Sequence, residues 1–238
     1  MTHVVVGYPT LTDTVRLINI MARYASYIEL QIPFSDPLAD GPTIMQACEA
    51  SLKNGTTVAD AFAIARQLTK EISVPLLFMC YYNSLLRYGV QKFVTDAKKA
   101  GVAGLIVPDM PLEEETYEHF YAYCKQHDMP VIFVVSPVTS DKRLQQLATH
   151  AKFFVYATAR QGITGARKEL DSQTVAFLAR VKKFFSIPVA VGFGISTKDH
   201  VRALRGKAEI AVVGSALIDR IKRREEVEDF LSGLSMVE

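Results

Sequence analysis

Short apolar runs rich in β-branched residues alternate along the whole chain with longer amphipathic segments. Runs this apolar are typical of strands covered on both faces, as in a parallel sheet. The segments between them carry apolar residues at helical spacing, for example Leu17, Ile18 and Met21. Eight strands are predicted, at residues 3–6, 27–31, 75–80, 102–107, 131–135, 153–156, 188–191 and 210–213.

Eight strand and helix units fit a closed barrel better than an open sheet. The chain has 238 residues, and a (β/α)₈ barrel typically needs about 250. A doubly wound open sheet more often stops at roughly five or six strands. No Gly/Ser linker, charge block or change of composition divides the chain. We therefore predict an α/β fold, with residues 1–238 forming a single TIM-barrel domain.

Composition narrows the class of protein. The net charge is +2, and Lys and Arg are dispersed, so neither nucleic-acid binding nor an anionic membrane surface is predicted. No apolar run has the length of a membrane span. Cys48, Cys80 and Cys124 are odd in number and widely spaced, which favours neither a disulfide framework nor a zinc site. We expect a cytoplasmic protein.

Residues 29–42 read E-L-Q-I-P-F-S-D-P-L-A-D-G-P and place two acids around one loop. Glu29 lies in a run that should be buried, where a carboxyl tends to keep its proton near neutrality and can act in acid/base catalysis. The alternative is a structural pair with an Arg or a backbone amide. Asp40 follows on the loop, where Asp36 and Asp40 could equally be ordinary turn residues.

Glycines after the last two predicted strands suggest phosphate binding. Gly192 and Gly194 allow backbone amides to approach a ligand, and Gly214 with Ser215 opens the final helix, whose N-terminus attracts anions. Gly165, after the sixth strand, adds another candidate amide. A lone glycine more often only makes a tight turn, but adjacent loops at one barrel end favour a phosphate site.

Other polar residues give weaker signals. Tyr81 and Tyr156 end strands, where a tyrosine commonly packs in the core with its hydroxyl at the rim. Four of the histidines are expected on helices or helix ends, so the sequence indicates neither a catalytic histidine nor a metal site. They are His119, His127, His150 and His200.

Five motifs in chain order resemble one known family. They are P-F-S-D-P-L-A-D-G-P at residues 33–42, preceded by Glu29-Leu30, then Y-Y-N at 81–83, G-I-T-G-A-R at 162–167, G-F-G-I-S at 192–196 and V-V-G-S-A at 212–216. Over essentially its whole length, the chain resembles the tryptophan synthase α subunit. The resemblance implies a (β/α)₈ barrel and retro-aldol cleavage of indole-3-glycerol phosphate to indole and glyceraldehyde 3-phosphate.

The resemblance also implies roles for individual residues. Glu29 matches the general acid that protonates indole C3, and Asp40 matches the acid that takes or balances the proton on the indole nitrogen. Tyr156 matches a tyrosine beside the catalytic Glu, Tyr81 one that lines the indole pocket, and Thr164 a lid threonine that reaches the aspartate. The phosphate-binding matches, with Phe193 packing between them, are Gly165, Gly194, Gly214 and Ser215.

A partner follows from the same resemblance. It is a β subunit that carries pyridoxal phosphate and receives indole in an αββα assembly, while the α chain itself needs no cofactor. The loop with Asp36 and Pro37 is expected to face that partner. Two readings remain beside this one: a stand-alone indole-releasing lyase, and a weakly catalytic module that activates the β subunit.

Two positions depart from the family pattern near the expected site. His3 stands where the family has a Phe in the first strand, and Gln31 replaces a small Gly two residues after the catalytic Glu. A bulky polar group at residue 31 is expected to affect Glu29, and His3 is expected to change one wall of the pocket.

Overall fold

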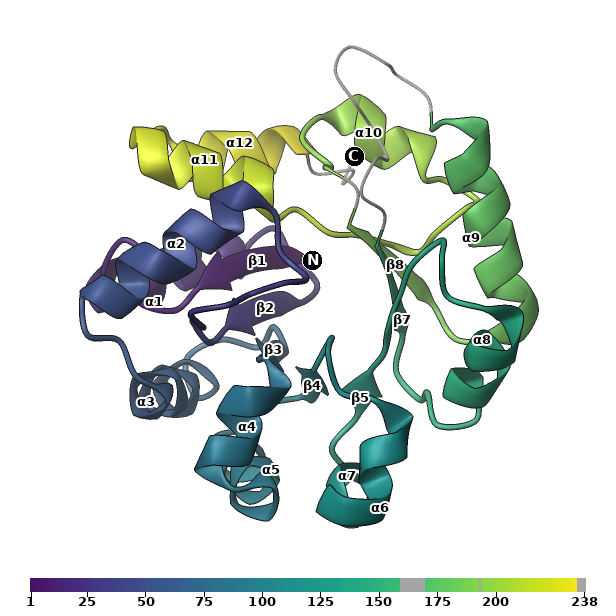
Figure 1. The fold of residues 1–238 in the computed structure, drawn as a ribbon. Coiled ribbons are helices and arrows are strands. Elements are labelled where there is room, and N and C mark those ends of the chain that lie inside the picture. Colours follow the sequence, from purple (N-terminus) through teal and green to yellow (C-terminus); the bar gives the residue numbers. More distant parts are fainter. Residues whose placement is uncertain (159–169, 193, 235–238) are drawn as a thin grey trace.

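The computed structural model describes residues 1–158, 170–192 and 194–234, and its strands and helices alternate along the chain (Figure 1). The strands are β1 Thr2–Val5, β2 Ile28–Gln31, β3 Leu76–Met79, β4 Gly104–Ile106, β5 Val131–Ile132, β6 Val134–Val135, β7 Val155–Thr158, β8 Val189–Gly192 and β9 Ile210–Ala211. Every pairing between neighbouring strands is parallel in this part of the chain.

Helices follow every strand except β5 and pack outside the ring of strands in Figure 1. They are α1 Leu11–Met21, α2 Pro42–Lys53, α3 Val58–Leu68, α4 Tyr82–Tyr88, α5 Val90–Lys99, η1 Leu112–Glu114, α6 Glu115–Glu118, α7 Phe120–Gln126, α8 Asp141–Ala148, α9 Ser172–Phe184, α10 Lys198–Ala203, α11 Ser215–Arg223 and α12 Val227–Leu234. Several of them begin at a side-chain cap. Thr57, for example, forms a capping box with Asp60 at the start of α3.

The strands close into a barrel. The order β1-β2-β3-β4-β5 continues as β6-β7-β8-β9, because only Phe133 separates β5 from β6. At the other seam the first and last strands meet: the His3 amide donates to the Val213 carbonyl at 3.1 Å, and the Val213 amide donates to the Met1 carbonyl at 3.0 Å. The predicted (β/α)₈ barrel is confirmed.

Side chains alternate between the inside of the barrel and the helix layer, as the two-residue period of a strand requires. On β3, Leu77 and Met79 belong to an inner apolar cluster, whereas Leu76 and Phe78 pack in the larger cluster beneath the helices. The inner cluster also contains Ile106, Phe154, Ala190 and Val212. The barrel therefore has a packed interior, and polar side chains on the inner face stand out against it.

Several strands differ from their predicted bounds: the one predicted at 102–107 is Gly104–Ile106, and the one predicted at 210–213 is Ile210–Ala211. Two others differ as follows. The run at 131–135 is interrupted at Phe133, so its first part pairs with β4 and its second part with β7. The strand predicted at 153–156 begins two residues later, at Val155. Phe153 and Phe154 instead pack against Tyr27, with ring centroids 5.4 and 5.6 Å from the Tyr27 ring. Phe153 and Phe154, which hydropathy alone assigns to a strand, are therefore used for aromatic packing instead.

Candidate active site

Glu29 is a buried carboxylate on the inner face of β2. Ile28 and Leu30 belong to the cluster under the helices, so the alternation turns Glu29 and Gln31 into the barrel. The exposed fraction of Glu29 is 2%. A carboxylate so far from water needs compensation from a partner or a ligand.

His3 is the side chain that meets Glu29. It is the register partner of Glu29 across β1 and β2, and it is 3% exposed. Its Nδ1 lies 3.4 Å from Glu29 Oε2, within ion-pairing range but not aligned as a hydrogen bond. Burial by itself lowers the pKa of His3, but the neighbouring carboxylates of Glu29 and Asp40 outweigh it and leave that pKa above its ordinary value.

Asp40, on the loop between β2 and α2, is held by two neutral donors. Gln31 Nε2 donates to Asp40 Oδ2 at 2.6 Å, and the Tyr81 hydroxyl donates to the same oxygen at 2.9 Å. Burial raises the pKa of Asp40, and the charge of His3 and these two hydrogen bonds oppose that rise only in part. Asp40 is therefore fixed in place with its proton affinity increased.

Tyr81 fixes both the loop and Asp40. Its hydroxyl accepts a hydrogen bond from the Ala39 amide at 3.0 Å, and its ring stacks on Phe34 with centroids 5.3 Å apart. These two rings form an aromatic wall beside Asp40. Burial and the adjacent Asp40 carboxylate raise the pKa of Tyr81 far above its ordinary value, so the hydroxyl stays a donor.

Tyr156 on β7 approaches the carboxylates from the opposite part of the barrel. Burial, followed by the charges of Glu29 and Asp40, raises the pKa of Tyr156 well above its ordinary value. A Cβ atom on Gly192 of β8 would lie 2.7 Å from the Tyr156 ring. A side chain at residue 192 would thus displace the tyrosine, which explains why glycine suits this position.

The predicted phosphate loops are described in part. Gly214 precedes α11, where no side chain caps the helix, and the first amides of a helix have no partner within it. A Cβ on Gly214 would lie 3.7 Å from His3 Cβ, so this loop is next to the carboxylates. Gly194 has φ +67°, which favours glycine. Thr164, Gly165 and Phe193 lie outside the described residues.

Asp36 and Pro37 occupy the outer part of the loop. Asp36 is exposed, and its carboxylate accepts a hydrogen bond from the Ser35 hydroxyl, while the Pro37 ring is buried. Next to them, Leu38 is 89% exposed. The two aspartates of the loop therefore differ: Asp40 faces the carboxylate site, and Asp36 faces solvent beside an exposed apolar side chain.

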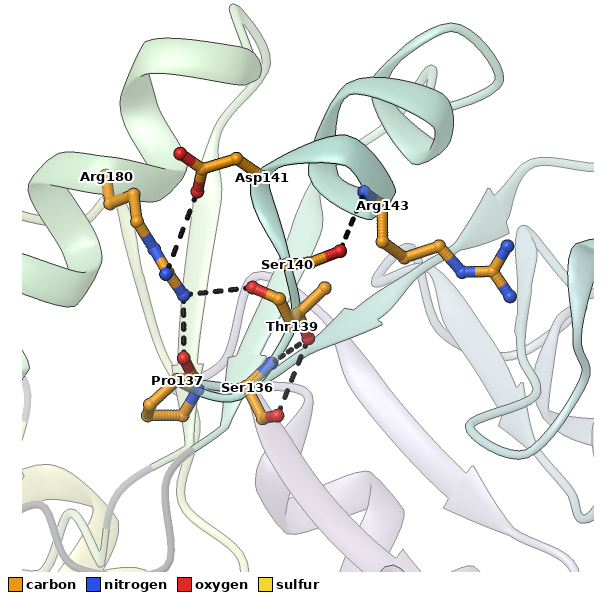
Figure 2. A network of polar contacts seen from close by, with 7 residues as sticks. All are labelled: Ser136, Pro137, Thr139, Ser140, Asp141, Arg143 and Arg180. Atoms are coloured by element: carbon orange, nitrogen blue, oxygen red, sulfur yellow. Dashed lines mark hydrogen bonds and ion pairs between the residues drawn. The ribbon is translucent and has the colours of Figure 1, made fainter.

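A second polar cluster lies in the turn of residues 136–141, between β6 and α8 (Figure 2). Arg180 donates to the carbonyls of Pro137 and Thr139, at 2.8 and 3.1 Å, and pairs with Asp141 at 3.7 Å. An open groove of about 550 Å³ lies nearby, along α8 and η1. Neither the turn nor the groove includes a residue of the carboxylate site.

Sequence reasoning missed two members of the site. It expected His3 only to change a pocket wall and Gln31 only to affect Glu29 through its bulk, whereas His3 contacts Glu29 and Gln31 donates to Asp40. The alternation along β2 was a usable signal for Gln31, because residues 29 and 31 share a face. In the described part of the chain, no group of three or more His, Cys, Asp or Glu side chains could hold a metal ion. None of the helices described there is long and apolar enough to cross a membrane.

Comparison with known proteins identifies the family. The family model for the tryptophan synthase alpha chain matches residues 1–235. The tryptophan synthase alpha chain of Desulfotalea psychrophila is 43% identical, over 92% of this chain and 85% of its own length. That of Methanocaldococcus jannaschii is 40% identical, over 91% of this chain and 77% of its own length.

Solved structures of similar fold come from the same family. A chain from the tryptophan synthase α₂β₂ complex of Pyrococcus furiosus has a TM-score of 0.91 and 36% identity, covering 98% of this chain and 94% of that one. A mutant alpha-subunit from the same organism has a TM-score of 0.89 and 34% identity, with coverage of 98% and 96%. With matching motifs, matching fold and identity near 40% over most of its length, this chain belongs to the tryptophan synthase alpha chain family.

Proposed function

We propose that this chain is the α subunit of a tryptophan synthase and cleaves indole-3-glycerol phosphate to indole and glyceraldehyde 3-phosphate. The observation that carries the proposal is the pair of carboxylates at one barrel mouth, with Glu29 buried on β2 and Asp40 held by Gln31 and Tyr81. Family membership supports the same reaction.

The two carboxylates divide the proton transfers. Glu29 delivers a proton to indole C3, which turns the ring into a leaving group. Asp40 takes or balances the proton on the indole nitrogen as positive charge develops there. The bond from C3 to the side chain then breaks as the neighbouring hydroxyl loses its proton and becomes the aldehyde. Two acids in different surroundings suit these different tasks, one buried in the barrel and one on a polar loop.

The remaining residues bind and orient the substrate. Tyr81, stacked on Phe34, lines the side of the indole ring, and Tyr156 lies beside Glu29 as a neutral phenol. The phosphate is bound by amides of Gly194, Gly214 and Ser215, together with Gly165. The family resemblance assigns substrate binding to Phe193 and Thr164 as well, which lie outside the described residues.

The partner is a tryptophan synthase β subunit in an αββα heterotetramer, and pyridoxal phosphate belongs to that subunit. This chain runs its own reaction without a cofactor, because proton transfers are sufficient for a retro-aldol cleavage. The exposed Asp36 and Leu38, with Pro37 between them, form part of the surface that meets the partner. This assembly is the same kind that its Pyrococcus furiosus relative forms.

Two broader assignments complete the proposal. Residues 1–238 form one TIM-barrel domain, since ring closure joins Thr2 near one end of the chain to Val213 near the other. The protein works in the cytoplasm, where a reducing environment suits the free, buried thiols of Cys48, Cys80 and Cys124.

The decisive experiment measures indole release from indole-3-glycerol phosphate, with and without a cognate β subunit. We expect slow release by the isolated chain and clear acceleration by the β subunit. Turnover that the β subunit leaves unchanged would select the stand-alone lyase. No turnover in either condition, with a gain in β-subunit activity, would select the activating module.

Glu29→Gln tests the central assignment. It keeps the size of the side chain but removes the acid, and we expect indole release to fall by about 10² to 10⁴-fold. Glu71→Gln is the matched control, because Glu71 is exposed before β3, at the opposite end of the strands. Equal activity of the two variants would contradict the role of Glu29.

A further inference from the structure

His3 has no place in the mechanism given above, yet it is the closest polar neighbour of Glu29. Their strands pair in register, so both side chains enter the barrel at one level, and Nδ1 faces Oε2 at 3.4 Å. Among the described residues, Glu29 Oε2 and His3 Nε2 make no hydrogen bond. The only polar contact that Oε2 makes in this part of the chain is therefore the imidazole.

The surroundings favour a charged pair. Besides Glu29, the groups that act on His3 are the Asp40 carboxylate and the Gln31 side chain, and both favour the imidazolium. Tyr156 on β7 and the amino group of Met1, just before β1, both interact electrostatically with Glu29. A phenyl ring at residue 3, as the family resemblance leads one to expect, would leave Glu29 buried without this compensation.

We propose that His3 is a positioning residue that shares one proton with Glu29, so that the two side chains act as a single acid in indole release. This inference rests on the proposed function. The resting pair holds its proton on His3 Nδ1. As the N–H bond breaks, the proton passes through Glu29 to indole C3, where the new C–H bond forms. The pair regains a proton when the substrate hydroxyl O–H bond breaks and the carbonyl forms.

The pair predicts a distinctive pH dependence. An imidazole beside a carboxylate keeps its proton to higher pH than a carboxyl group alone. Activity should therefore persist up to the raised pKa of His3 and fall above it. Without the imidazole, the proton depends on the carboxyl alone, and the fall in activity should begin at lower pH.

The test combines two variants with a readout that is independent of activity. His3→Asn keeps an N–H donor near the position of Nδ1 but cannot titrate, and His3→Phe removes both properties. We expect His3→Asn to lower kcat for indole release roughly 10-fold and to move the basic limb of its pH profile down by at least about one pH unit. His127→Asn is the control, since His127 contacts Thr95 at the end of α7, away from the carboxylates.

The second readout is the imidazole titration of His3, followed by ¹⁵N NMR in the folded chain. Replacing Glu29 by Gln should lower the pKa of His3 by at least about one pH unit. The proposal would be contradicted if the pH profile of His3→Asn matched that of the wild type, or if Glu29→Gln left the pKa of His3 unchanged.

The proposed function and the pairing can also fail separately. If the wild type releases no indole but the pKa of His3 depends on Glu29, the proposed function is wrong and the pairing is retained. If His3→Phe does not fold, the pH profile of His3→Asn and the titration of the His3 imidazole still test the pairing.

Discussion

The carboxylate site and the 136–141 turn differ in how far their buried polar atoms are hydrogen-bonded. Three buried atoms of the carboxylate site have no hydrogen-bond partner among the described residues: Glu29 Oε2, His3 Nε2 and Gln31 Oε1. At the 136–141 turn, by contrast, Arg180 uses both terminal nitrogens on Pro137, Thr139 and Asp141 (Figure 2). Within the same described part, Arg180 Nε is the one buried side-chain nitrogen or oxygen of that cluster without a hydrogen-bond partner.

This difference in hydrogen bonding distinguishes a ligand-binding site from a cluster that only stabilises the fold. Buried polar groups are nearly always hydrogen-bonded, so a local group of exceptions indicates a place where a ligand completes the bonds. A cluster whose donors are already used on backbone carbonyls instead fixes a loop. Changes at the first region should therefore affect catalysis, and changes at the second should affect stability.

Among the changes that test this contrast between the two regions, Asp40→Asn should have the largest effect. Loss of the acid at the indole nitrogen should reduce kcat by about 10²-fold or more. Stability should move the other way, because burial raises the pKa of Asp40 and its ionised form opposes folding. That cost is complete above the folded-state pKa and absent below the ordinary value. The variant should thus have a larger free energy of unfolding at pH 7, with no gain near pH 3.

Urea unfolding at both pH values, together with the indole assay, checks this prediction. A variant that loses stability at pH 7 as well as activity would show that Asp40 supports the fold in the same way as Arg180, and the contrast between the two regions would disappear.

Arg180→Met should give the opposite result. It removes hydrogen bonds from a charged donor to two carbonyls, and partial exposure reduces their value, so we expect the free energy of unfolding to fall by about 1–2 kcal/mol. Indole release by the isolated chain should stay within about twofold of the wild type. Arg180→Lys keeps the charge but lacks the forked geometry, and it should be intermediate in urea unfolding. A large loss of activity in Arg180→Met without loss of stability would contradict the distinction.

Within the carboxylate site, a smaller effect on activity than that of Asp40→Asn is expected from Tyr81→Phe. The change removes a hydrogen bond that stabilises ionised Asp40, so the pKa of Asp40 should rise and the acidic limb of the kcat profile should move to higher pH. Near neutrality kcat should fall by about 3 to 10-fold. Tyr88→Phe is the control, since the Tyr88 hydroxyl donates to Asp96 at 2.8 Å away from the site. An acidic limb that stays in place would show that Tyr81 only packs against Phe34.

Much of the fold follows from local pattern. Each of the eight predicted strands has a counterpart in the structure, because apolar β-branched runs have few other ways to bury both faces. Two of the exceptions involve aromatic residues: Phe133 interrupts one strand, and another begins only after Phe153 and Phe154, which pack against Tyr27. Such packing depends on partners far away in the chain, which a local pattern cannot report.

For the site, the sequence by itself determined that Glu29 lies in a buried strand and that Asp40 and the glycines of the last loops follow strand ends. The two-residue period then assigns Glu29 and Gln31 to one face. Only the tertiary structure decided which side chains meet. Barrel closure places His3 of the first strand between Glu29 and Gly214. The tertiary fold also places Gln31 and Tyr81 where both donate hydrogen bonds to Asp40. Periodicity fixes the direction of a side chain along its own strand, whereas its partners depend on register and closure, which are set by the whole ring.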